Sequence, residues 1–257
     1  PRSTPSNSSA ASDVYKRQYL GGKGINAKIF WDRVPPEVKP FSHDNLLVFA
    51  AGVLTGTPAP AAGHGCISFK SPQTNLISYS IVGGFWAPEL KHAGYDSIVI
   101  SGKSPSPVYL WINDDNVEIR DAGHLWGKDT IETHEIIREE LDNDRVQILC
   151  IGPAGENKVC IATIEDPRTG ASASRTGSGA VMGDKNLKAI AVLGTRDVNV
   201  ARPAELMELR DSILGKSEAL RNYFRDNTHV VGKFAQEFID WGVYGNVDEM
   251  PAGLGFE

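Results

Sequence analysis

Four glycine-bearing loops hold residue types that could bind an anionic cofactor. They span residues 21–24, 54–65, 83–86 and 172–179. Glycine lets backbone N–H groups approach a ligand closely, and consecutive N–H groups can form a concave anion site. In the last loop, Arg175 could supply a fork of donors to a phosphate. The alternative for each loop is that its glycines only turn the chain of a crowded sheet protein.

Conventional catalytic groups are not apparent in the sequence. No Gly-x-Ser-x-Gly elbow has partners that can be placed around it. His124 and His134 are expected to be structural or solvated, and His43 and His229 show no useful spacing. We therefore predict no catalytic residue in this chain. Any chemistry is expected to belong to a bound cofactor.

One glycine motif resembles a dinucleotide-binding fingerprint. It spans residues 177–183, and Asp197 follows at the distance of a ribose-binding acid. That fingerprint needs a strand directly before it and a full helix after it. Here the preceding residues are rich in Arg and Ser, and the next predicted strand leaves no room for a helix. We therefore predict no nicotinamide site.

The three cysteines, Cys66, Cys150 and Cys160, argue against a disulfide scaffold. Their number is odd and they form no Cys-x-x-Cys pair, so a reducing, cytoplasmic compartment is expected. No complete zinc or iron–sulfur ligand set can be built from these spacings. We therefore expect three ordinary, partly buried thiols and no protein-held metal.

Composition excludes several further classes of protein. The 257 residues carry 26 Lys and Arg against 32 Asp and Glu, a net charge of 26 − 32 = −6. This mild acidity argues against a nucleic-acid partner, which needs a concentrated basic face. No apolar run approaches the roughly 20 residues that a membrane span requires. A soluble globular protein is expected.

Short apolar runs bounded by turn residues predict strands in the first part of the chain. These runs cover residues 46–51, 97–101, 108–112, 117–119, 146–151, 159–164 and 188–193. A helix is expected at 130–141, because Asp129 can cap it and its apolar residues share one face. The turn residues from Asp114 to Asn116 predict a hairpin. Strands outnumber helices in this part of the chain.

Helical patterns dominate after about residue 195. Pro203 suits the first turn of a helix over 203–224, and a second amphipathic stretch covers 233–241. The change from strands to helices places a domain boundary near 198–202. The fold class expected for the whole chain is α+β.

Three segments follow from this division. Residues 1–18 lack an initiator Met and are almost without apolar side chains, so we expect a non-native leader; a native disordered N-terminus is the alternative. Residues 19–200 form the main domain. Residues 201–257 are expected to be the beginning of a truncated helical domain, because no closing element follows the last amphipathic stretch.

Six motifs, which include parts of the loops above, resemble in their order and spacing the tungsten-containing aldehyde ferredoxin oxidoreductase family. The motifs lie at residues 54–60, 70–72, 83–96, 125–130, 151–157 and 179–189. The resemblance extends from about Tyr19 to Val200. It implies a domain of two related β-sheets with helices, shaped as a saddle under a tungsten bis-pterin cofactor. The resemblance also implies that dithiolene sulfurs of the pterins hold the metal, so the chain needs no metal-ligand motif.

The resemblance assigns the pterin contacts residue by residue. They fall on His64, Ile81, Gly83, Ala171, Ser172, Ser174 and Arg175. Gly83 and Arg175 match the family pattern, whereas His64 and Ala171 each stand where the aldehyde-oxidising pattern has Arg. Ile81 replaces an Asn whose carbonyl serves a magnesium ion between the pterins. Magnesium is therefore doubtful at Ile81, although main-chain oxygens could coordinate one.

Some loops look more like the tungsten subunit of ATP-independent benzoyl-CoA reductases. These are residues 31–38, 71–74, 84–88 and 171–175. The broad family default is oxidation of aldehydes to carboxylates with ferredoxin. The alternatives are the active-site subunit of an aryl-CoA reductase, and a non-catalytic pterin-binding protein.

The resemblance also implies partners outside this chain. The cysteine motif for a [4Fe–4S] cluster is expected beyond Glu257. Electrons would pass to or from ferredoxin or an iron–sulfur electron-transfer subunit. The substrate would be a small aldehyde or an aryl-CoA, and the protein could assemble as a homo-oligomer.

Overall fold

The computed structural model describes residues 18–226, and for residues 216–226 it describes the backbone alone. The chain divides into two compact units between Ala201 and Arg202. The leader predicted at 1–18 and the amphipathic stretch predicted at 233–241 lie outside the described residues, apart from residue 18. None of the described helices is long and apolar enough to cross a membrane.

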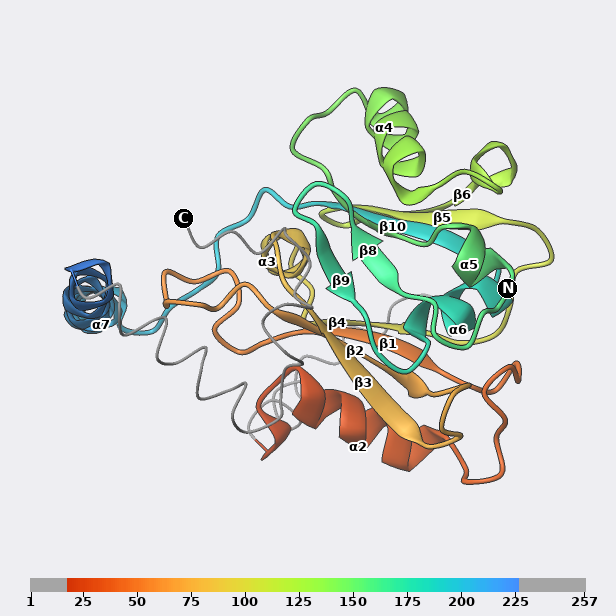
Figure 1. Ribbon diagram of the computed structural model, residues 1–257, viewed down its shortest axis with the longest axis horizontal. Coiled ribbons are helices and arrows are strands. Elements are labelled where there is room, and N and C mark those ends of the chain that lie inside the picture. The colour runs from red at the N-terminus through yellow and green to blue at the C-terminus, as the bar shows by residue number, and fades with distance from the viewer. Residues whose placement is uncertain (1–17, 227–257) are drawn as a thin grey trace, which may run out of the picture. The chain divides into compact units, whose positions relative to one another are not determined.

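The first sheet has four antiparallel strands in the order β3-β2-β1-β4. The strands are β1 (Leu47–Ala51), β2 (Gly65–Lys70), β3 (Ile77–Val82) and β4 (Ser97–Ile100). Helix α2 (Lys23–Arg33) contacts β1 and β2. In Figure 1 this helix covers the face of the sheet that points away from the rest of the domain.

The second sheet has six strands in the order β6-β5-β10-β7-β8-β9. The strands are β5 (Val108–Asn113), β6 (Asn116–Asp121), β7 (Gln147–Cys150), β8 (Ile164–Asp166), β9 (Ala171–Ala173) and β10 (Leu187–Leu193). β10 pairs parallel to β5 and antiparallel to β7, so the sheet is mixed. β3 is an edge of the first sheet and β9 is an edge of the second, and these two strands contact each other.

The remaining helices of the first unit lie around its two sheets, and the second unit begins with a helix. They are α3 (Trp86–His92), η1 (Gly123–Leu125), α4 (Thr130–Leu141), α5 (Pro153–Glu156), α6 (Ser178–Asp184) and, in the second unit, α7 (Pro203–Asp226). α4 begins with a capping box: the Asp129 side chain accepts the Glu132 amide at 2.8 Å, and the Glu132 carboxylate accepts the Asp129 amide at 3.2 Å. The predicted helix at 130–141 and its cap are thereby confirmed.

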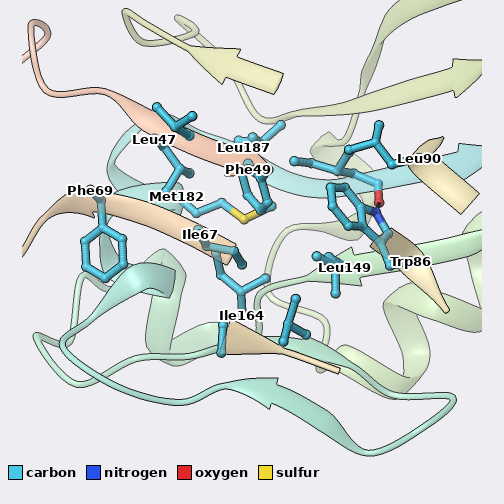
Figure 2. Close-up of a cluster of buried hydrophobic side chains, with 14 of the residues drawn as sticks. Leu47, Phe49, Ile67, Phe69, Trp86, Leu90, Leu149, Ile164, Met182 and Leu187 are labelled. Atoms are coloured by element: carbon cyan, nitrogen blue, oxygen red, sulfur yellow. Dashed lines mark hydrogen bonds between the residues drawn. The ribbon is translucent and has the colours of Figure 1, made fainter. Parts of the chain in front are cut away.

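The main core lies between the two sheets. Figure 2 shows side chains from both sheets meeting there, with α3 and α6 contributing as well. The labelled residues are Leu47, Phe49, Ile67, Phe69, Trp86, Leu90, Leu149, Ile164, Met182 and Leu187. The Trp86 indole N–H also donates to the Ile190 carbonyl at 3.1 Å, which ties α3 to β10. A second cluster fills the space between the other face of the six-stranded sheet and α4.

The two-sheet α+β architecture agrees with the sequence expectation, and six of the seven predicted strands are present as β1, β4, β5, β6, β7 and β10. The strand predicted at 159–164 is wrong. α5 is followed there by turns, in which Lys158 has φ +56° and the Val159 amide bonds to the Ala154 carbonyl. Val159 and Ile161 are exposed, so this apolar run lies on the surface.

The expectation that no helix fits after the 177–179 glycines is also wrong. α6 has seven residues, all of them buried. Its glycines allow the backbone to pack closely: a Cβ on Gly179 would lie 2.2 Å from the Thr163 carbonyl oxygen, and one on Gly183 would lie 2.0 Å from the Gly155 carbonyl oxygen. The glycine motif thus serves helix packing, and its buried helix offers no surface for a dinucleotide.

Replacing Gly183 with Ala is expected to destabilise the domain by about 1–3 kcal/mol, because the added methyl must displace backbone. Gly152→Ala provides the control, since a Cβ there meets its nearest neighbour at 3.6 Å and should cost much less. Chemical unfolding of the purified variants measures both effects. Equal stability of the two variants would contradict this account of α6.

Candidate cofactor site

Three of the residues predicted to contact a pterin meet at one point of the structure. Gly83 follows β3, His64 precedes β2, and Ala171 begins β9. A Cβ built on Gly83 would lie 3.9 Å from the His64 Nε2 atom and 3.9 Å from the Ala171 Cβ atom. The missing side chain of Gly83 therefore leaves a small recess between an imidazole and a methyl group.

Ile81 lies on the same strand as this recess but on its outward face. It pairs with Cys66 of β2 and is 44% exposed, beside the outward-facing Tyr79. The Lys23 ammonium lies 3.5 Å from the centre of the Tyr79 ring. Ile81 thus offers a hydrocarbon surface, and its side chain has no oxygen for a magnesium ion.

The six-stranded sheet and the loop after it contribute three of the predicted contacts, Ser172, Ser174 and Arg175. Ser172 lies in β9 and pairs with Glu165 of β8, and both Ser174 and Arg175 are exposed. We call residues 174–176 the Arg175 loop; it connects β9 to α6. Within the described part of the chain, no carboxylate forms an ion pair with the Arg175 guanidinium. Its donors are therefore open to a ligand.

A buried carboxylate lies behind the recess. A Cβ on Gly84, whose φ is +85°, would lie 2.8 Å from both the Asp166 Oδ2 and the Thr169 Oγ1 atoms. Asp166 is 1% exposed, and its Oδ2 atom has no hydrogen-bond partner among the described residues. The sequence does not single out Asp166. The residues that follow it are typical of a turn, and such a pattern predicts only that the chain changes direction.

Comparison with known proteins shows what this arrangement is related to. The family described as aldehyde ferredoxin oxidoreductase, N-terminal domain, matches residues 5–194. The chain belongs to this family. It is 45% identical over 210 residues to a tungsten-containing aldehyde ferredoxin oxidoreductase of Pyrococcus horikoshii, covering 82% of this chain and 34% of that protein.

Other relatives of the family carry different names. An aliphatic sulfonate oxidoreductase, WOR-like subunit, of Pyrococcus furiosus is 38% identical, covering 72% of this chain and 31% of that protein. A chain of the solved active site complex BamBC of benzoyl coenzyme A reductase, in complex with 1,5-dienoyl-CoA, is 59% identical with a TM-score of 0.77. That match covers 79% of this chain and 31% of the solved one. This chain therefore spans about a third of the length of its relatives.

The site suits a polar, phosphate-bearing organic group such as the family's pterin. It presents guanidinium, hydroxyl and imidazole donors around a glycine recess, with a hydrocarbon wall at Ile81. No group of three or more His, Cys, Asp or Glu side chains in the described residues could hold a metal.

The candidate site is an open surface, not a closed cavity. His64, Ile81, Ser174 and Arg175 are all exposed. A cavity of about 950 Å³ lies elsewhere, between residues 37–44 and the Pro72–Asn75 turn, and none of the seven predicted contacts lines it. The chemistry of the exposed residues, and not the volume of a cavity, defines the candidate site.

The histidines singled out from the sequence as non-catalytic lie next to α4. His134 is 6% exposed on α4, and burial lowers its pKa. The Nε2 atom of His124, in η1, lies 2.5 Å from a Glu140 carboxylate oxygen. α4 covers the face of the six-stranded sheet opposite the main core (Figure 1), and the His124–Glu140 contact joins η1 to it.

The three thiols are expected to differ in reactivity. Burial raises the pKa of Cys150 to about 12 and also raises the pKa of Cys66, whereas Cys160 is exposed. A raised pKa leaves little thiolate, which is the reactive form. At pH 8, iodoacetamide followed by peptide mass spectrometry should label Cys160 first. Labelling of Cys150 at the rate of Cys160 in the native protein, with unfolded protein as the reference, would contradict the burial described here.

Proposed function

We propose that this domain forms one wall of a tungsten bis-pterin site and that the whole protein is a two-electron oxidoreductase. The observation that supports this best is the meeting of His64, Gly83 and Ala171, in a chain of a tungsten-enzyme family. Arg175, whose carbonyl accepts a hydrogen bond from Ser80 of β3, forms no ion pair among the described residues. The elements that carry these residues come from both sheets, so the folded domain, and neither sheet alone, presents the site.

Each residue would contribute binding or orientation. The Arg175 guanidinium can bind a pterin phosphate with two parallel hydrogen bonds, and Ser172 and Ser174 can donate hydroxyl protons beside it. Gly83 allows the ligand to approach the backbone. The His64 imidazole can donate to an anionic group in the place where the family has Arg. Ile81 would pack against the flat part of the ligand.

When bound, the tungsten group supplies the two-electron redox chemistry, and its dithiolene sulfurs supply the metal ligands. The chain's three cysteines are also too few for the four thiolate ligands of a [4Fe–4S] cluster. We place the [4Fe–4S] cluster outside this chain. Electrons would then pass to ferredoxin or to an iron–sulfur subunit. The Ile81 side chain gives no support to a magnesium ion between the pterins.

Two substrate classes remain for the whole protein, and sequence identity favours one. Identity to the benzoyl coenzyme A reductase chain is 59%, against 45% for the Pyrococcus horikoshii aldehyde enzyme. Reduction of an aryl-CoA ring is therefore the favoured activity. Oxidation of aldehydes to carboxylates is the second candidate, because tungsten-containing relatives at 44–47% identity carry that name.

Replacing Arg175 with Ala in the full-length protein should lower tungsten and pterin content together. A charge-assisted hydrogen bond contributes about 1.5–3 kcal/mol, so its loss implies roughly tenfold weaker binding or more. Tungsten is measured by elemental analysis and pterin by fluorescence after oxidation. The control is Arg145→Ala, which removes an exposed Arg before β7. Unchanged content in Arg175→Ala would overturn the site assignment.

The substrate class is tested with the two half-reactions. A cyclic 1,5-dienoyl-CoA becomes aromatic by releasing two electrons and two protons. An aldehyde instead takes up water to give the carboxylic acid, and it also releases two electrons and two protons. We expect the full-length enzyme to reduce an artificial electron acceptor with the dienoyl-CoA and not with simple aldehydes. The reverse preference would establish the aldehyde branch. Enzyme carrying Arg175→Ala is the control for activity that depends on the site.

A further inference from the structure

The residue after Arg175 has an unfavourable backbone conformation. Thr176 has φ +64°, in the left-handed region. Of the eight non-glycine residues with positive φ in the described part of the chain, Thr176 is the one with a β-branched side chain. That side-chain type is a strong outlier in this region. Such a conformation persists only where surrounding contacts hold it, and it often marks a functional site.

Two buried serines hold the peptide groups on either side of Thr176. The Ser80 hydroxyl donates to the Arg175 carbonyl at 2.6 Å, and the Ser71 hydroxyl donates to the Thr176 carbonyl at 2.7 Å. The first carbonyl belongs to the peptide group before Thr176 and the second to the one after it. Fixing both peptide groups fixes the φ and ψ angles between them. We call these two hydrogen bonds the serine clamp.

The serine clamp joins the two halves of the candidate site. Ser80 is 4% exposed on the inward face of β3, and Ser71, which follows β2, is fully buried. The Arg175 loop instead leaves the edge of the six-stranded sheet. Because Ile81 and Gly83 lie one and three residues after Ser80, the clamp sets the position of the Arg175 loop relative to the other side of the site.

We propose that Ser80 and Ser71 are positioning residues that hold the Arg175 loop in its left-handed conformation and so direct Arg175 toward the phosphate of the bound cofactor. This inference rests on the proposed function. Neither serine contacts the ligand; each acts through a carbonyl of the loop. Without the clamp, Thr176 would relax out of the left-handed region, and Arg175 would turn away from the site.

Ser80 is the better residue to test. The Ser71 hydroxyl also accepts the amides of Gln73 and Thr74, so its removal would disturb the turn before β3 as well. Ser78 is the matched control for Ser80: it lies on the same strand and face, and its hydroxyl forms no hydrogen bond with the described residues. Ser80→Ala therefore removes a hydrogen bond of the serine clamp, whereas Ser78→Ala removes none.

The decisive variant is the double change Ser80→Ala with Thr176→Gly. Glycine adopts positive φ without steric cost, so the loop should keep its shape without the clamp. If Ser80 served only general packing, an added glycine would make the protein more flexible and would restore nothing. Rescue by Thr176→Gly thus separates positioning of the loop from ordinary stabilisation by a buried hydrogen bond.

The experiment measures tungsten and pterin per mole of full-length protein, together with the midpoint of thermal unfolding. Ser80→Ala should bind cofactor about fivefold or more weakly, the ratio expected when a strained residue is released. Ser78→Ala should match the unmodified protein, and the double variant should recover its content.

Three results would overturn the inference. Unchanged content in Ser80→Ala would show that the clamp is dispensable. Equal loss in Ser78→Ala would make the effect general to β3, and no recovery in the double variant would make the role of Ser80 structural. Arg175→Ala, measured alongside, separates the two proposals: if it loses cofactor while Ser80→Ala does not, only the clamp fails. If Arg175→Ala keeps its cofactor, the proposed function fails.

Discussion

The close approach of backbone to backbone around α6 is the constraint on which the rest of the domain depends. Cβ atoms on Gly177, Gly179 and Gly183 would lie 2.1, 2.2 and 2.0 Å from carbonyl oxygens of residues 155–163. No residue larger than glycine fits at these distances, so the backbone of α6 packs directly against the segment from α5 to β8. The Arg175 loop ends where α6 begins. Its position is therefore determined by this contact on one side and by the serine clamp on the other.

A buried ion pair stabilises the part of the domain that contains α5 and α6. Lys188 of β10 is fully buried and lies 2.5 Å from a Glu156 carboxylate oxygen; its ammonium also donates to the Lys128 carbonyl at 2.7 Å. The Glu156 carboxylate accepts the Gly127 amide at 3.0 and 2.9 Å from its two oxygens. A buried ion pair offsets its desolvation only when such additional hydrogen bonds are made. These contacts join β10, α5 and the segment before α4, and α5 in turn supports α6.

The sequence predicts the parts of this protein whose signals are local. The cap at Asp129 and the hairpin at Asp114 depend on neighbouring residues, and both are present as expected. β2 was not predicted, because its buried Ser68 and Lys70 interrupt the kind of apolar run by which the other strands were predicted. The strand predicted at 159–164 failed because apolar residues there lie on a surface turn. For the candidate site, family motifs predict Gly83 and Arg175, but the Ser80 contact spans 95 residues and carries no sequence signal.

The candidate site lies where two separate sheets pack against each other. Contacts of side chains, and not the pairing of strands, therefore hold its two sides together. β3 and β9 are edge strands that touch without forming a ladder, so no backbone register fixes one against the other. Two other features position β3 and β9 relative to each other. The shared core behind them, with Ile67 on one sheet and Ile164 on the other, sets the separation of the sheets. The serine clamp then fixes the Arg175 loop across the junction. Unpaired edges also leave the recess at Gly83 open, which a continuous sheet would have closed.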